Sequence, residues 1–241
     1  MKQKIATIIL GAGKGTRMKS DKPKVLMPVC GKPMIKHITD TLEQIPVDEI
    51  VTVISPEGED VAKTVAPYKT CVQEKQLGTG HAVNCAKDLL KGFDGTILVV
   101  FGDTPLITKP TFQHIIDKVQ EGFAVVVLGF KPDDPARYGR LVMKNNELDR
   151  IVEFKDASDA EKAINFCNSG VMAFDGKYLF DILAKIGNNN AAGEFYLTDA
   201  VETAHKMNLK CTAIEGNAEE VASANTLEEL AQLEIYCKKA S

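Results

Sequence analysis

A glycine-rich segment that carries two cations lies near the start of the chain. Residues 10–18 read LGAGKGTRM and directly follow an apolar run. Glycines let a backbone approach a ligand closely and turn its N–H groups towards anionic oxygens. Lys14 and Arg17 lie in this segment and Lys24 follows it, so several cations could meet phosphate oxygens. The segment predicts a phosphate-binding loop, and the alternative is a tight strand-to-helix turn whose cations are merely solvated.

Two common nucleotide-binding fingerprints do not fit this loop. The dinucleotide pattern G-x-G-x-x-G needs glycine where Thr16 stands, and no acidic residue follows a second strand at the spacing of a ribose contact. The P-loop pattern G-x-x-x-x-G-K-[ST] does not occur there either. These mismatches argue against a dinucleotide-dependent dehydrogenase and indicate a phosphate loop of another kind.

A carboxylate follows the apolar run at residues 96–101. Asp103 comes directly after Gly102, where a strand should end at the ligand-binding edge of a parallel sheet. A hard carboxylate oxygen there suits Mg²⁺, which proteins hold with one or two oxygens plus phosphates and water. The alternative is an ordinary turn residue before a Thr-Pro pair.

Short apolar runs alternate with amphipathic stretches over the first half of the chain. The apolar runs are rich in Val and Ile, as buried strands are. They cover residues 5–10, 50–54, 96–101 and 124–130. The helical patterns between them cover residues 33–43, 58–65, 79–90 and 110–120. This alternation predicts an α/β fold with a doubly wound, mostly parallel sheet and right-handed crossovers.

The pattern changes after residue 131. A loop rich in Pro and Asp leads to two strand-like segments at 140–144 and 148–154, which predict a β-hairpin turning at two asparagines. A further strand is predicted at 166–174. Helical patterns return at residues 177–184, 196–206 and 226–238. We therefore expect residues 1–241 to form a single domain, with a nucleotide-binding half at about 1–130 and a second substrate half at about 131–241.

The composition excludes several classes of partner. Hydrophobic residues make up 44% of the 241 residues, enough for a substantial core, and the formal net charge of −4 gives no overall attraction to nucleic acid or acidic membranes. The six cysteines show no C-x-x-C spacing, which indicates reduced thiols in a cytoplasmic protein. Apolar runs are of strand length, so neither a membrane span nor a secretion signal is predicted.

Ordered motifs along nearly the whole chain resemble those of the sugar-phosphate nucleotidyltransferases. The segments are GTRMKSDKPKVL at 15–26, QEKQLGTGHA at 73–82, FGDTPL at 101–106, RYGR at 137–140, VEFKD at 152–156, NSG at 168–170, GEFYLTD at 193–199 and AN at 224–225. The first most resembles the N-terminal uridyltransferase domain of the bifunctional bacterial enzyme that makes UDP-N-acetylglucosamine. The resemblance implies a Rossmann-like nucleotidyltransferase fold with an inserted β-hairpin that forms a sugar-binding lobe.

The resemblance also implies which residues bind the nucleotide. They are Leu10, Ala12, Gly13, Gln73, Gly78 and Thr79. Gln73 matches the position that recognises uracil in the family, and an amide that both donates and accepts hydrogen bonds suits the edge of uracil. Gly78 and Thr79 could equally begin an ordinary helix, and both functions are compatible. His81 is expected to be structural, or to act through residues that contact the substrate without contacting it itself, because the reaction needs no acid–base step.

Metal and sugar ligands come from the resemblance as well. It assigns Asp103 and Asn225 as the two protein ligands of Mg²⁺, although Asn225 could instead cap the helix that follows. Gly139, Glu153 and Asn168 match the sugar-binding positions. The alternatives are an exposed strand end for Glu153 and a plain turn around Asn168.

The reaction implied by the resemblance joins UTP to N-acetylglucosamine 1-phosphate and releases pyrophosphate. Positioning and charge stabilisation should dominate such a transfer, with Lys14 and Arg17 on the leaving phosphates and Lys24 at the α-phosphate. Two alternatives remain: the same chemistry on another hexose 1-phosphate or with dTTP, and a non-catalytic subunit that senses nucleotide sugars. A sensor should have lost the cations or metal ligands, all of which are present here.

The bifunctional enzyme of this family continues into hexapeptide repeats that form a β-helix, carry acetyl transfer and drive trimer formation. This sequence shows no such repeats, either because the protein is a stand-alone uridyltransferase or because the chain is a shortened form. We expect no acetyltransferase activity from it, and the oligomeric state stays open.

Overall fold

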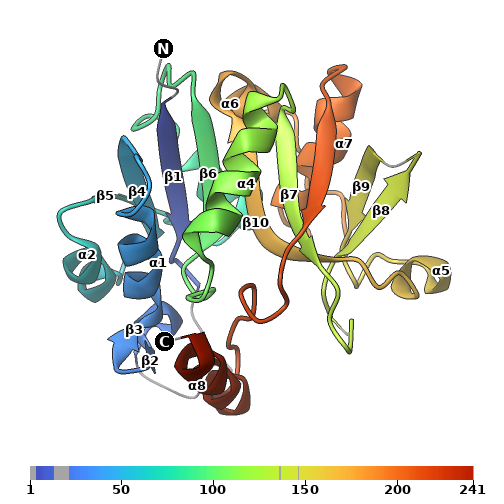
Figure 1. Cartoon of the computed structure of the whole chain (residues 1–241). Helices are drawn as coiled ribbons and strands as arrows, with labels where there is room; N and C mark the ends of the chain where they lie inside the picture. Colours follow the sequence, from blue (N-terminus) through green and yellow to red (C-terminus); the bar gives the residue numbers. More distant parts are fainter. Residues whose placement is uncertain (1–3, 14–21, 136, 146, 241) are drawn as a thin grey trace.

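A computed structural model of the chain describes residues 4–13, 22–135, 137–145 and 147–240. Within these ranges, one mixed sheet of nine strands runs through the molecule, with strand order β11-β7-β10-β6-β1-β4-β5 and a β8–β9 hairpin attached to β10 (Figure 1). Strands from both the first and the second half of the chain belong to this sheet.

The strands of the main path are β1 (Ile5–Leu10), β4 (Glu49–Ile54), β5 (Lys69–Val72), β6 (Thr96–Phe101), β7 (Val125–Phe130), β10 (Cys167–Asp175) and β11 (Cys211–Glu215). β1 pairs in parallel with β4 and β6, β4 with β5, and β7 with β11. β10 is antiparallel to both β6 and β7. The expectation of a mostly parallel sheet is therefore confirmed, with one reversed strand inside it.

The predicted hairpin is present, formed by β8 (Arg140–Lys144) and β9 (Glu147–Val152). Asn145 lies at the turn with a positive φ of 51°, a conformation that asparagine tolerates better than most residues. A short second hairpin, β2 (Pro28–Val29) with β3 (Lys32–Pro33), lies below the main sheet.

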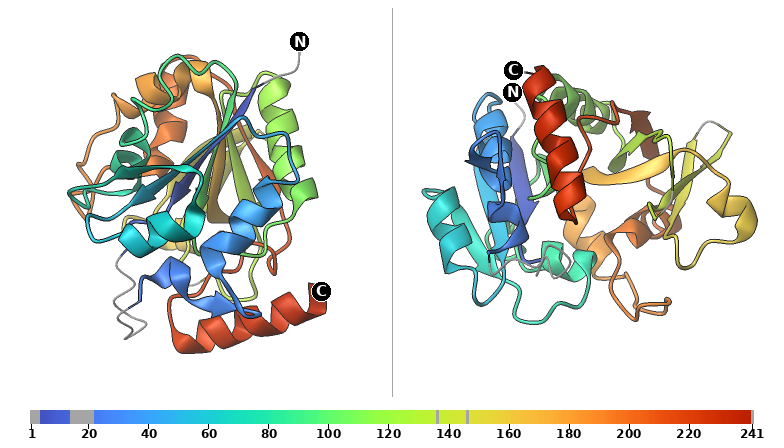
Figure 2. Two further views of the ribbon diagram at one scale, coloured as in Figure 1. Left: turned by 90° about the vertical axis from the view of Figure 1, so that its left-hand side faces the viewer. Right: turned by 90° about the horizontal axis from the view of Figure 1, so that it is seen from below.

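Helices cover both faces of the sheet, as a doubly wound fold requires (Figure 2). On one face lie α1 (Met34–Leu42), α2 (Glu59–Val65) and α4 (Lys109–Gln120), and on the other α3 (Thr79–Asn84), α6 (Gly176–Leu183) and α7 (Ala200–Lys206). Because both faces are covered, all six residues of β1 are buried, which explains the continuous apolar runs in the sequence. No helix of the described chain is long and apolar enough to cross a membrane.

The remaining helical segments are short or lie near the end of the chain, and Leu197 of one of them is buried in the core on the α3, α6 and α7 face. They are η2 (Lys24–Leu26), α5 (Asp159–Lys162), η3 (Leu197–Asp199) and α8 (Leu227–Ala240). α8 lies beside the β2–β3 hairpin, where Val29, Met34, Ala224, Leu233 and Cys237 form a small separate core. This contact brings the last part of the chain next to the segment that follows the glycine-rich loop.

The helix predicted at 79–90 is shorter than expected. α3 ends at Asn84, and the chain continues in tighter turns in which Ala86 and Lys87 donate to the carbonyls three residues earlier. Ala86 and Leu90 are nevertheless buried, because over so few residues the tighter turns keep the same side chains facing the core. β5 and β11 were not predicted, because each lies at an edge of the sheet and lacks a strong apolar run.

Candidate active site

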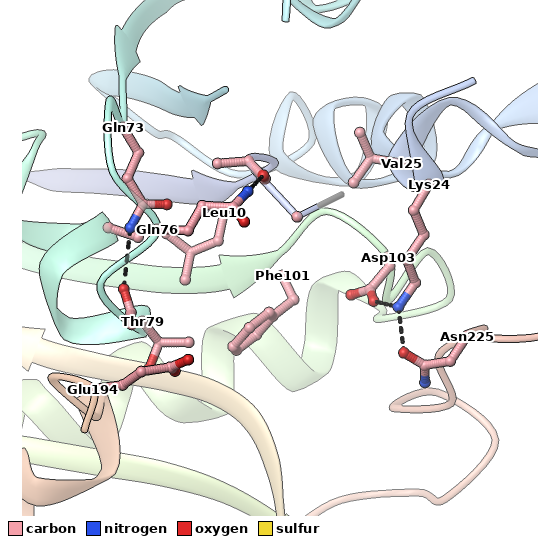
Figure 3. A pocket seen from close by; sticks show the side chains of 14 residues that line it. Leu10, Lys24, Val25, Gln73, Gln76, Thr79, Phe101, Asp103, Glu194 and Asn225 are labelled. Atoms are coloured by element: carbon pink, nitrogen blue, oxygen red, sulfur yellow. Dashed lines mark hydrogen bonds and ion pairs between the residues drawn. The ribbon is translucent and has the colours of Figure 1, made fainter. Parts of the chain in front are cut away.

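A cavity of about 420 Å³ opens at the carboxyl-end edge of the parallel strands (Figure 3). Leu10 ends β1, Gln73 follows β5 and Asp103 follows β6, so three strand ends deliver side chains to one place. The lining residues are Leu10, Ala12, Gly13, Lys24, Val25, Gln73, Gln76, Gly78, Thr79, Ala82, Phe101, Asp103, Glu194 and Asn225.

The cavity brings together the predicted nucleotide-binding and metal-binding positions. All six predicted nucleotide residues line it, and so do Lys24, Asp103 and Asn225. Lys14 and Arg17 lie outside the described residues, so their predicted contacts with phosphate stay predictions. Gly13, which directly precedes Lys14, lines the cavity.

Lys24 joins the two candidate metal ligands. Its ammonium forms an ion pair with the carboxylate of Asp103 and donates to Oδ1 of Asn225 at 2.7 Å (Figure 3). The side chains of Lys24 and Asp103 are 12% and 16% exposed, so these charges are held largely out of water. A Cβ added at Gly102 would lie 2.8 Å from Cγ1 of Val25, so the glycine lets the end of β6 approach η2. The local sequence thus places Lys24 against Asp103.

Asp103 and Asn225 present oxygens that fit a hard divalent cation. Both oxygens meet at one cationic group, the Lys24 ammonium, and carboxylate and amide oxygens are the donors that Mg²⁺ prefers. Asn225 does not cap α8, because the helix begins at Leu227 and Oγ1 of Thr226 accepts from the Glu229 N–H at 3.2 Å. For Asp103 the turn alternative also holds, since Thr104 donates back to the carbonyl of Phe101.

The stretch from Gly78 to Gly80 is fixed against a distant segment. Gly78 has a φ of 113°, and a Cβ there would lie 2.5 Å from the carbonyl oxygen of Phe195. The Gly80 N–H donates to that same carbonyl at 2.8 Å, and Oγ1 of Thr79 accepts from the Leu197 N–H at 2.9 Å. The hydrogen bond that the Thr79 hydroxyl accepts therefore helps to hold this segment in place. α3 does begin at Thr79, so the helix-initiation alternative is correct as well.

A second cavity of about 630 Å³ adjoins the first, and Thr79 and Glu194 line both. Glu153, predicted to bind sugar, also lines the second cavity and is half-buried, not exposed. Its Oε1 accepts from the Thr198 hydroxyl at 3.1 Å. Burial raises the pKa of Glu153, the Thr198 hydrogen bond opposes that rise, and the nearby Asp156 charge adds to it.

The other two predicted sugar positions lie beside Glu153. The Asn168 N–H donates to the carbonyl of Gly139 at 2.8 Å, and a Cβ on Gly139 would lie 3.5 Å from Oε2 of Glu153. Oδ1 of Asn168 accepts from the Gly170 N–H at 3.0 Å, within an irregular part of β10. Of these three positions, Glu153 alone is among the described residues that line the second cavity.

A family model described as the MobA-like NTP transferase domain matches residues 7–169. The chain belongs to this nucleotidyltransferase family. The membership confirms the enzyme class that the motifs predicted and excludes the dehydrogenase alternative on independent grounds.

Curated relatives extend the likeness to nearly the whole chain. The bifunctional protein GlmU of Rhodospirillum rubrum is 50% identical over 233 residues, which cover 96% of this chain and 52% of that protein. The bifunctional protein GlmU of Rhizobium leguminosarum bv. trifolii is 43% identical over 241 residues, covering 98% and 53%. The chain spans about half the length of the curated relatives it matches.

A solved structure shares the fold of the transferase. It is a Bacillus anthracis protein named as a glucose-1-phosphate thymidylyltransferase, in complex with sucrose, which superposes with a TM-score of 0.80 at 22% identity. The superposition covers 96% of this chain and 94% of the other. It confirms the predicted nucleotidyltransferase-like α/β architecture.

Five residues that line the first cavity were not predicted from the sequence: Val25, Gln76, Ala82, Phe101 and Glu194. Gln76 donates to the carbonyl of Ala12 at 2.6 Å and so ties the wall of the cavity near Gln73 to the glycine-rich loop. Phe101 ends β6 and packs against Gly170, and Glu194 lines both cavities. Gln76 and Glu194 each lie in a segment that carries the family resemblance, QEKQLGTGHA and GEFYLTD, and those motifs are the signal that could have identified them.

Proposed function

We propose that the transferase joins UTP to N-acetylglucosamine 1-phosphate, giving UDP-N-acetylglucosamine and pyrophosphate. One observation carries this proposal: Lys24, Asp103 and Asn225 meet in a cavity that has Gln73 on its wall and adjoins a second cavity lined by Glu153. A base reader, a phosphate site and a sugar site in adjoining cavities are what a nucleotide-sugar synthase needs. The motif resemblance supports the choice of base and sugar.

The proposed chemistry is a direct displacement. A phosphate oxygen of the sugar 1-phosphate attacks the α-phosphorus of UTP in line, the bond to the bridging oxygen of the β-phosphate breaks, and pyrophosphate leaves. Such transfers need positioning and charge stabilisation, and no covalent intermediate on the protein. Lys24 supplies a fixed cation at the cavity wall, next to where the α-phosphate would lie. We assign Lys14 and Arg17, outside the described residues, to the leaving phosphates.

Asp103 and Asn225 would hold Mg²⁺, whose bound charge would neutralise the phosphate oxygens. Lys24 now contacts both of these oxygens, so its ammonium and a metal ion compete for the same two donors. With Asp103 and Asn225 holding a metal ion, the Lys24 side chain would instead contact a phosphate oxygen. Lys24 would thus act as a stand-in cation before substrate binds and as a phosphate ligand afterwards.

Glu153 supports a sugar in the second cavity. Its half-buried carboxylate is held by Thr198 and stands close to Gly139, so it can accept hydrogen bonds from sugar hydroxyls in a defined direction. We assign the sugar side to Glu153, Gly139 and Asn168 together, with Asn168 set by its own bond to Gly170.

The test is pyrophosphate release from UTP and Mg²⁺, comparing N-acetylglucosamine, glucosamine and glucose 1-phosphates and then dTTP in place of UTP. We expect the N-acetylated sugar and UTP to give the fastest release. Asp103→Asn, which keeps the shape but removes the charge, should abolish it, whereas Asp94→Asn at an exposed ion pair should not. Tight UTP binding without release from any sugar would overturn the proposal and favour a sensing subunit.

A further inference from the structure

The amide of Gln73 is buried although it lines the first cavity. The residue is 5% exposed, and its backbone N–H donates to the carbonyl of Ile54 at 2.8 Å, at the end of β4. Its Nε2 donates to the carbonyl of Gly78 at 3.2 Å and lies 3.1 Å from Nδ1 of His81. Figure 3 shows the Gln73 side chain with its nitrogen on this hydrogen bond and its oxygen turned away from it.

The neighbours of this amide fix which way round it sits. The Gly78 carbonyl can only accept, and it already accepts the Ala82 N–H at 3.0 Å, so the amide end facing it must be the NH₂ group. The second N–H of Nε2 then meets Nδ1 of His81. That ring nitrogen must act as an acceptor, which places the imidazole proton on Nε2 of His81.

Gln73 therefore presents only its oxygen to a base in the cavity. The N3–H of uracil or thymine can donate to such an oxygen, whereas N3 of cytosine carries a lone pair and would meet it unfavourably. If the amide were reversed, its NH₂ group would instead favour cytosine. The direction of one buried amide thus decides which pyrimidine edge fits.

We propose that His81 is a positioning residue that, by accepting from Gln73, makes the base site select an imide N–H over the ring nitrogen of cytosine. The inference rests on the proposed function, because it takes the Gln73 side of the cavity as the base site. The Gly78 carbonyl accepts one N–H of the Gln73 amide and His81 accepts the other, so neither N–H is left to face a base. The backbone that carries Gly78 is itself held in place, because the Phe195 N–H donates to the carbonyl of Leu77, the residue before Gly78, at 2.8 Å.

Two variants of His81 separate positioning from simple packing. His81→Leu keeps bulk but removes the acceptor. His81→Asn keeps an acceptor, since the asparagine oxygen can take the place of Nδ1. The dissociation constants of UTP and CTP, each with Mg²⁺ and without sugar, are measured by calorimetry for wild type and both variants, and melting temperatures are recorded alongside.

We expect wild type to prefer UTP, and His81→Leu to lose about tenfold of that preference, partly through tighter CTP binding. His81→Asn should keep most of the preference. If His81→Leu weakened the binding of UTP and CTP by the same factor, the preference would be unchanged. That result would show a purely structural histidine and overturn the inference. Wild type that binds neither nucleotide would remove the proposed function itself, so the two failures are distinct.

Discussion

At the scale of single residues, Lys24 contacts both oxygen-bearing side chains that we propose hold the metal ion. Its removal should have two opposite effects, one on catalysis and one on metal binding. These effects separate the role of a phosphate ligand from that of a stand-in cation.

Lys24→Met should lower kcat/KM by on the order of 10²-fold, because a fixed cation is lost from the reacting phosphates. The same change should tighten the binding of Mg²⁺ alone, because the ammonium no longer competes for Asp103 and Asn225. Steady-state kinetics and calorimetric titration with Mg²⁺ measure the two effects. Lys69→Met, at an exposed ion pair with Glu49, is the control, and an unchanged Mg²⁺ affinity would contradict the competition.

Asp199 gives a pH-dependent prediction. Burial, followed by the charges of Glu202, Glu153 and Asp156, raises the pKa of Asp199 to about 6. Because the folded state holds this proton more tightly than the unfolded state, stability is greatest below the ordinary carboxyl pKa and falls as pH rises through about 6.

Asp199→Asn removes the free-energy cost of ionising this buried carboxyl. It should therefore raise Tm by about 2 °C at pH 8, with little effect near pH 4. Thermal melts at the two pH values test it. Asp181→Asn, at an exposed position of α6, serves as the matched change and should shift neither melt. A gain in Tm at pH 4 that equals the gain at pH 8 would refute the electrostatic origin.

The sequence identifies some site residues better than others. Asp103 follows Gly102 just after β6, and Lys24 follows the glycine-rich loop in the sequence, so their types and positions predict a phosphate and metal site directly. Asn225 is distant in the chain and reaches them only because α8 packs beside the β2–β3 hairpin, and no local pattern contains that contact. The orientation of the Gln73 amide depends on the positions of the Gly78 carbonyl and the His81 ring, which spacing cannot supply.

At the scale of elements, the Gly78–Gly80 stretch connects the Gln73 wall of the first cavity to residues 195–197. This contact depends on the absence of a side chain at Gly78, where both the positive φ and the closeness of Phe195 exclude one. The proposed base site and the segment at residues 194–197, which reaches both cavities through Glu194, are therefore coupled through backbone contacts.

Gly78→Ala should weaken UTP binding at least tenfold and lower Tm, because the new Cβ meets the Phe195 carbonyl and must displace that segment. Gly122→Ala is the matched control, since Gly122 has a φ of 99° but no atom within 4 Å of an added Cβ. Calorimetry and thermal melts compare the two variants. Equal losses in both would mean that backbone strain alone, without the clash, explains the effect.

Elements buried on both sides were predictable, and edge elements were not. The runs that became β1, β6 and β7 are continuous because helices cover both faces of the sheet. β5 has no buried residue and gives no clear period. The antiparallel direction of β10 follows from the path of the chain through the β8–β9 hairpin, which an apolar pattern does not encode.

At the scale of the whole molecule, one sheet joins residues from both halves of the chain. β10, from the second half, lies between β6 and β7 from the first. The two cavities lie side by side and share Thr79 and Glu194. Neither half can therefore unfold without exposing the buried strands of the other.

We propose that the chain unfolds as one domain, and urea should give a single transition. Circular dichroism reports the backbone, and the five tyrosines, without any tryptophan, report tertiary packing by fluorescence. The two signals should change together with one midpoint. Separate midpoints would show that the nucleotide-binding and sugar-binding halves are independent units.

The measurement that most directly tests the proposed reaction follows the phosphate of the sugar. UTP and Mg²⁺ are incubated with the chain and N-acetylglucosamine 1-phosphate whose phosphate carries ¹⁸O, and both products are analysed by mass spectrometry. Direct attack by the sugar phosphate predicts UDP-N-acetylglucosamine that carries the label and pyrophosphate that does not. Labelled pyrophosphate, or no nucleotide sugar despite bound UTP, would contradict the proposed reaction.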